Sequence, residues 1–133
     1  MTRVVLDTSA FLAFANREPG AERVQSVLRT AFISAVNASE VVGKLVKKGF
    51  TVTEAEQYLI GFVKDIVPFD MTHAGVAASL IGLTQTHGLS LGDRSCLALA
   101  KSLNVPVLTA DQVWGKVEIG VTIELIRSTQ ASQ

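Results

Sequence analysis

The stretch LSLGDRSCLALAKSLNVPVLTADQ, residues 89–112, decides the fold class of this chain. Residues of its first half recur at the spacing of one helix face: Asp93, Cys96, Leu97, Ala100 and Leu103. The side opposite that face carries Arg94, Ser95, Ala98, Lys101 and Ser102. This pattern predicts an amphipathic helix with an acid at the head of its apolar face. The second half predicts a buried strand at 105–109, and a helix leading directly into a buried strand is half of a βαβ unit.

The lengths of these two elements place Asp93 and Asp111 at the same level. About 11 helical residues at roughly 1.5 Å each descend about 16 Å, and a five-residue strand at roughly 3.3 Å per residue climbs about 16 Å back. If the helix packs antiparallel to its strand, both carboxylates lie at the carboxyl edge of a parallel sheet. Open α/β folds bind their ligands at that edge.

Composition favours a single domain over residues 1–133, because this length can bury one core. The chain has 48% hydrophobic residues, which favours a sheet covered on both faces. A formal net charge of zero gives no overall basic surface for nucleic acid, although a local patch can still exist. The single cysteine, Cys96, is predicted to be a core thiol in a reducing compartment. No signal peptide or membrane span is predicted, so we expect a cytoplasmic protein with no membrane partner.

Strand and helix patterns alternate along the chain. Short apolar runs predict strands at 3–6, 31–34, 66–69, 105–109 and 121–126, and amphipathic patterns predict helices between them. This alternation predicts an α/β fold, a three-layer α/β/α sandwich on a mainly parallel sheet of about five strands. Residues 128–133 are expected to form a frayed tail.

Several local features carry more specific expectations. The segment Asn37–Glu40 has the form of a helix capping box, with Lys44 and other lysines on the exposed side of the same helix. Ile60 is expected on the buried stripe of the next helix. His73 and His87 are predicted to be surface or helix-end histidines and not ligands of a soft metal.

Four acids, Asp7, Glu40, Asp93 and Asp111, each occur where a strand gives way to a helix or turn. Each one alone is also explained as a helix cap or a solvated side chain. Together at one sheet edge they would repel one another unless a multivalent cation neutralised them. Oxygen ligands without His or Cys select a hard ion such as Mg²⁺ or Mn²⁺, and such an ion suits hydrolysis of a phosphodiester.

The sequence resembles the PIN domain family. The segments VVLDTS at 4–9, ISAVNASE at 33–40, LSLGDR at 89–94 and VLTAD at 107–111 are similar to the ordered acidic motifs of that family. The resemblance covers nearly the whole chain and is closest to the VapC toxins of bacterial VapBC toxin-antitoxin pairs.

This resemblance implies an endoribonuclease that depends on Mg²⁺ or Mn²⁺, is held inactive by a cognate VapB-like antitoxin, and commonly forms a homodimer. By motif position, Asp7 and Asp93 are the central metal ligands, Glu40 binds directly or through water, and Asp111 completes the catalytic cluster. Ser9 and Thr109 match hydroxyl positions that hold a ligand or water. Arg94 follows the third acid and, being predicted to be exposed, is a candidate RNA contact.

Two other readings stay open from the residues alone. The first is a PIN-like module that binds RNA or a protein without cutting. The second is a phosphatase with Asp7 as a phosphorylated nucleophile, a chemistry that usually needs a second acid two residues later, where this chain has Ser9.

Overall fold

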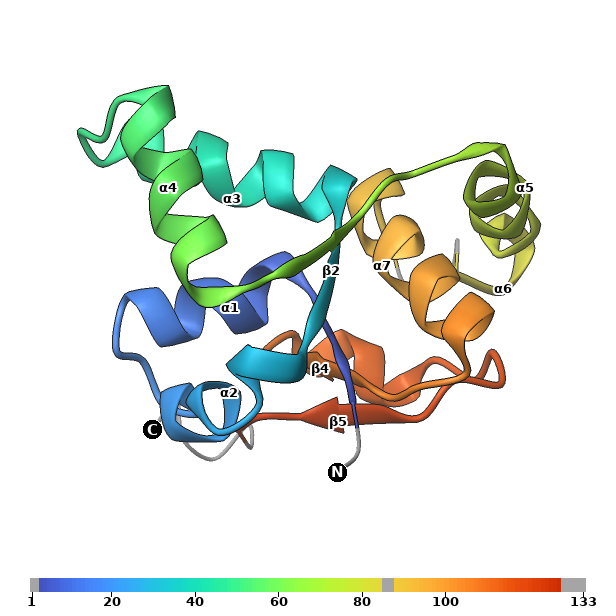
Figure 1. Ribbon diagram of the computed structural model, residues 1–133. Coiled ribbons are helices and arrows are strands. Elements are labelled where there is room, and N and C mark those ends of the chain that lie inside the picture. The colour runs from blue at the N-terminus through green and yellow to red at the C-terminus, as the bar shows by residue number, and fades with distance from the viewer. Residues whose placement is uncertain (1–2, 85–87, 128–133) are drawn as a thin grey trace.

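The computed structural model describes residues 3–84 and 88–127 (Figure 1). The predicted tail at 128–133 and the predicted helix end at His87 lie outside the described residues. The elements follow in the order β1 (Val5–Leu6), α1 (Thr8–Ala15), α2 (Ala21–Gln25), η1 (Leu28–Thr30), β2 (Phe32–Ser34), α3 (Ala35–Lys47), α4 (Val52–Phe62), β3 (Asp65–Val67), α5 (Met71–Ser79), α6 (Ile81–Thr84), α7 (Leu91–Leu103), β4 (Val107–Thr109), η3 (Gln112–Lys116) and β5 (Ile123–Leu125). None of the described helices is long and apolar enough to cross a membrane.

The strands form a five-stranded sheet in the order β3-β2-β1-β4-β5, and every pairing among them is parallel. Strand β1 lies at the centre, where Val5 pairs with Phe32 of β2 on one side and with Val107 of β4 on the other. All carboxyl ends therefore meet at one edge. The order reverses at β1, so the segments that follow β1, β2 and β4 converge beside it.

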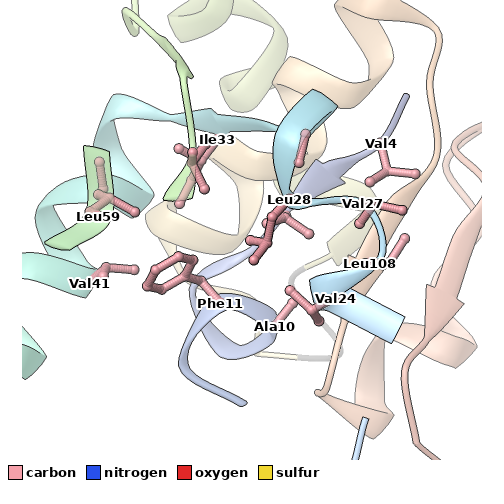
Figure 2. Close-up of a cluster of buried hydrophobic side chains, with 14 of the residues drawn as sticks. Val4, Ala10, Phe11, Val24, Val27, Leu28, Ile33, Val41, Leu59 and Leu108 are labelled. Atoms are coloured by element: carbon pink, nitrogen blue, oxygen red, sulfur yellow. The ribbon is translucent and has the colours of Figure 1, made fainter. Parts of the chain in front are cut away.

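Alternate residues of the strands face two separate cores, which confirms the predicted three-layer sandwich. Leu6 and Leu108 belong to the larger core. Its other members include residues of α1 to α4 such as Phe11 and Leu59 (Figure 2). The neighbouring strand residue Val107 faces the other way, into a core built with α7 and the buried Trp114. The sheet is thus covered on both faces, as its apolar composition predicts.

Helix α7 is more deeply buried than its amphipathic pattern predicts. Ser95 and Ala98, expected on the exposed side, are both fully buried, because α3 and α5 pack against α7 in addition to the sheet. The hydroxyl of Ser95 donates to the Leu91 carbonyl, 2.7 Å away, which satisfies its buried polar group within the helix. Cys96 is buried as predicted.

Three local expectations are wrong. Helix α3 begins at Ala35 with Ser34 as its N-cap, so Asn37 is not a cap but a buried residue inside the helix. Ile60 is exposed, since α4 turns the face of Ala55 and Leu59 toward the core. For His73 only the surface alternative is wrong: the residue lies at a helix end, in the first turn of α5, but it is buried there beside the ring of Phe69.

Candidate active site

Asp7 directly follows β1 and is the N-cap of α1, so its side chain lies at the carboxyl edge of the sheet and at the start of the helix. One carboxylate oxygen, Oδ1, accepts from the backbone N–H of Ala10 at 2.7 Å, and the other, Oδ2, accepts from the Thr109 hydroxyl at 2.6 Å. The side chain is buried, with the residue only 3% exposed. Burial raises the pKa of Asp7 to about 6, although the hydrogen bonds from Thr109, Ala10 and Ser9 oppose that rise.

Ser9 and Thr109 hold the Asp7 carboxylate between β1 and β4. The Ser9 hydroxyl lies 2.8 and 2.9 Å from the two carboxylate oxygens of Asp7 and 3.2 Å from the hydroxyl of Thr109. Each hydroxyl oxygen also accepts from a backbone N–H, that of Ala110 at 2.9 Å for Ser9 and that of Asp111 at 3.0 Å for Thr109. The two hydroxyls thus orient an acid and fix the start of the segment that carries Asp111.

Asp93 lies in the first turn of α7. Its carboxylate oxygen Oδ2 accepts from the N–H of Ser90 at 2.9 Å, while the Ser90 hydroxyl accepts from the N–H of Asp93 at 3.2 Å. This reciprocal pair is a capping box, so Asp93 also has the helix-capping role that is one explanation of each acid taken alone. Burial raises the pKa of Asp93, and the negative charges of Asp111 and Glu40 raise it further. The capping acid is therefore also a member of a charged cluster.

Glu40 is held at the cluster by hydrogen bonds from α1 and from its own helix, α3. Its Oε1 accepts from the hydroxyl of Thr8 at 2.5 Å and from Asn37 Nδ2 at 3.0 Å. The same Asn37 Nδ2 lies 3.2 Å from Thr8 Oγ1 and 3.1 Å from the carbonyl oxygen of Gly92. Gly92 leaves room for the acid, because a Cβ at that position would overlap the Glu40 carboxylate.

Asn37 is the site residue that sequence reasoning missed, because its position suggested a helix cap. Its amide nitrogen faces three oxygen acceptors, which fixes the orientation of the amide. The residue is 1% exposed and joins α1, α3 and α7 around Glu40. A signal was present in the spacing, since Asn37 and Glu40 lie one helical turn apart on one face.

Asp111 follows β4 and caps η3, where its Oδ1 accepts from the N–H of Val113 at 3.0 Å. Its negative charge is close enough to the cluster to raise the pKa of Asp93. Arg94 lies apart from the cluster. Its predicted exposure is wrong, because the side chain is half-buried and donates to the carbonyl of Ala77 on α5 at 3.1 Å. The arginine thus ties α7 to α5.

One cavity of about 470 Å³ brings the four predicted acids together. Its lining consists of Asp7, Thr8, Ser9, Leu12, Glu40, Gly43, Lys44, Lys47, Asp93 and Asp111. Within residues 3–84 and 88–127, none of the four acids forms an ion pair with a basic side chain. The cavity lining therefore carries four acids against two lysines, and this excess of negative charge attracts a cation.

The donor set suits a hard divalent cation bound partly through water. All four side chains offer carboxylate oxygens, which Mg²⁺ and Mn²⁺ prefer. As the described side chains lie, no three acidic, histidine or cysteine residues are close enough to ligate one ion together. Because Mg²⁺ keeps several of its waters and needs only one or two protein carboxylates, these residues fit such an ion.

Comparisons with known proteins agree with the observed fold. The fold is similar to that of a chain of the DNA-bound VapBC from Salmonella typhimurium, with a TM-score of 0.72 and 18% identity over 96% of this chain and 100% of that one. FitAcB from Neisseria gonorrhoeae matches with a TM-score of 0.67 and 22% identity, covering 92% of this chain and 97% of that one. VapC20 from Mycobacterium tuberculosis, a sarcin-ricin loop cleaving toxin, matches with a TM-score of 0.68 and 14% identity over 90% of this chain and 98% of that one.

A comparison with curated protein sequences found no match. The family model of the PIN domain matches residues 4–120, a range that includes all four acids and both hydroxyls of the site. The chain therefore belongs to the PIN domain family.

Proposed function

We propose that this protein is a VapC-like endoribonuclease that hydrolyses RNA phosphodiester bonds with Mg²⁺ or Mn²⁺. The observation that carries the proposal is the convergence of Asp7, Glu40, Asp93 and Asp111, from four separate segments, on one cavity. Structural roles do not require such an arrangement, because like charges in partly buried positions destabilise a fold. Binding of a divalent cation that activates a phosphodiester substrate would explain why all four acids lie together.

Each acid has a separate role in this proposal. Asp7 and Asp93 hold the cation, Glu40 contributes directly or through water, and Asp111 completes the negative cluster. When bound, the ion supplies Lewis-acid activation of the phosphoryl group and of the attacking water. Ser9 and Thr109 orient the Asp7 carboxylate through the hydrogen bonds described above, and Asn37 with Thr8 orients Glu40. The chain itself therefore contributes orientation of the carboxylates and a cavity with an excess of negative charge.

The test compares cleavage of single-stranded RNA by wild type, Asp7→Asn, Asp93→Asn and the surface control Glu56→Gln. We expect metal-dependent cleavage by wild type and Glu56→Gln, its loss with EDTA, and its return with Mn²⁺. Both Asn variants should lose activity and keep their circular dichroism spectra. Full activity in both Asn variants would refute the assignment, and RNA binding by wild type without any cleavage would favour the non-catalytic module instead.

We further propose a VapB-like antitoxin partner, a homodimer and a cytoplasmic location. The structural similarity to chains of VapBC and of another toxin-antitoxin complex supports the partner, since VapBC is a family of toxin-antitoxin systems. Co-purification of the tagged chain with the product of an adjacent small open reading frame, and loss of RNA cleavage in that complex, would support it. The absence of such a reading frame, together with RNA cleavage in the host that no other protein inhibits, would contradict it.

A further inference from the structure

Two lysines line the candidate active-site cavity together with the four acids. Lys44 and Lys47 line the same cavity as Glu40 and Gly43, all four from helix α3. Relative to Glu40 the other three stand at i+3, i+4 and i+7, which is one face of a helix. Helices α1 and α3 are in contact and run beside each other (Figure 1). The face of α3 that begins with an acid therefore continues with two cations.

Among the described residues neither of these two lysines has a fixed partner, whereas three of the four other lysines have one. Lys48 donates to the side chain of Asn16, Lys64 donates to the Ile60 carbonyl at 3.2 Å, and Lys101 donates to the Ile119 carbonyl at 3.5 Å. Within residues 3–84 and 88–127, neither Lys44 nor Lys47 makes a side-chain hydrogen bond or an ion pair. Both ammonium groups are thus available to an anion in the cavity.

We propose that Lys44 and Lys47 bind successive backbone phosphates of single-stranded RNA on one side of the cleaved bond. This inference rests on the proposed nuclease function and assigns the surface that the zero net charge of the chain leaves unidentified. The helical rise places the two residues roughly 6 and 10 Å along α3 from Glu40. A stacked strand advances about 3.4 Å per nucleotide, so these distances correspond to roughly two and three nucleotides.

Gly43 leaves the surface of α3 between Glu40 and the two lysines without a side chain. A Cβ at this position would meet no atom within 4 Å, so the glycine is not required by packing inside the protein. Its backbone has ordinary helical geometry, where alanine or leucine would be more favourable for the helix. The absence of a side chain leaves room for a strand that passes from the carboxylates to the ammonium groups.

The first test measures cleavage by the double variant Lys44→Ala/Lys47→Ala on two substrates. One is a single-stranded RNA 12-mer and the other is bis(p-nitrophenyl) phosphate, which has a single phosphate and therefore no second one to place at the lysines. Two lost phosphate contacts should raise KM for the 12-mer about 25-fold at 0.1 M salt and reduce its salt slope by about 1.4. Neither kcat nor KM for the small diester should change. Lys64→Ala, which removes the same charge next to the opposite edge of the sheet, should behave as wild type on both.

A parallel rise for both substrates, or no change for the 12-mer, would overturn the proposal. Wild-type protein that hydrolyses neither substrate would instead refute the nuclease function, so the two failures are distinguishable. The second test keeps both charges and blocks the path with Gly43→Leu. KM for the 12-mer should rise at least tenfold while the small diester is unaffected. Gly75→Leu, at a helical glycine of α5 that also has open space, is the matched control. Unchanged cleavage of the 12-mer by Gly43→Leu would also overturn the proposal.

Discussion

Thr109 donates a hydrogen bond of 2.6 Å to the carboxylate of Asp7 across a separation of 102 residues. The contact joins the ends of β1 and β4, which pair directly in the sheet. It is fully buried, and the same Thr109 oxygen accepts from the N–H of Asp111. A single hydroxyl therefore connects two of the four acids at the point where the strand order reverses.

Replacing Thr109 by Val should lower stability, because it removes both hydrogen bonds and keeps the shape of the side chain. Leaving a buried carboxylate and a backbone N–H less satisfied should reduce the free energy of unfolding by about 1–3 kcal/mol. Urea denaturation at pH 7 measures this loss. Thr53→Val, at an exposed position of α4, is the control and should stay within about 0.5 kcal/mol of wild type. A loss of that small size for Thr109→Val would show that the contact contributes little.

Much of this arrangement follows from the sequence, because strand-helix alternation and the edge rule of parallel sheets are properties of local patterns. The positions of Asp7 and Asp93 could be predicted in this way, since Asp7 stands one residue after β1 and Asp93 lies in the first turn of α7, and both elements have clear sequence patterns. Asn37 could not. Its role depends on Thr8 and Gly92 from two other helices, and a pattern within a single helix cannot reveal that contact.

Burial of α7 was underestimated for a similar reason. Ser95 and Ala98 are small and do not mark an apolar face, yet small residues permit close packing of α3 and α5. Arg94 is predicted to lie in solvent because charged residues usually do, but its long side chain reaches the carbonyl of Ala77 near the end of α5, which also accepts from the N–H of Leu80. The periodicity of the sequence predicts only which side of α7 faces the sheet. The burial of the other side depends on tertiary packing against α3 and α5.

In the absence of metal, Asp7 should make the protein less stable as pH rises. Its pKa is about 6 when folded, against an ordinary value of 3.8, so the folded state binds the proton more tightly. The resulting stabilisation is present below pH 3.8 and is lost as pH rises through 6, and a shift of this size corresponds to about 3 kcal/mol. The measurement is urea denaturation in EDTA at pH 4 and pH 7 for wild type and Asp7→Asn. The variant should lack this part of the pH dependence, and identical profiles would contradict the expectation.

Divalent cations should stabilise the folded protein through the same acids. At a Mn²⁺ concentration 100 times the dissociation constant, the gain is about 2.7 kcal/mol, which corresponds to a rise in Tm of roughly 8–12 °C for a domain of this size. Differential scanning fluorimetry with and without Mn²⁺ measures the shift. Asp93→Asn should show a much smaller shift, whereas Glu56→Gln on α4 should respond as wild type. An equal shift in Asp93→Asn would place the ion elsewhere.

Gly92→Ala should reduce activity without unfolding the protein. The new Cβ would overlap the Glu40 carboxylate, so Glu40 must leave its hydrogen bond with Asn37. A displacement of about 1 Å in a catalytic constellation can cost on the order of 100-fold in rate, and we expect a loss of roughly 10- to 100-fold in kcat. Stability should stay within about 1 kcal/mol, because alanine favours the helix over glycine. Gly75→Ala, whose Cβ would meet nothing, is the control with full activity. Undiminished cleavage by Gly92→Ala would mean that the position of Glu40 does not matter for catalysis.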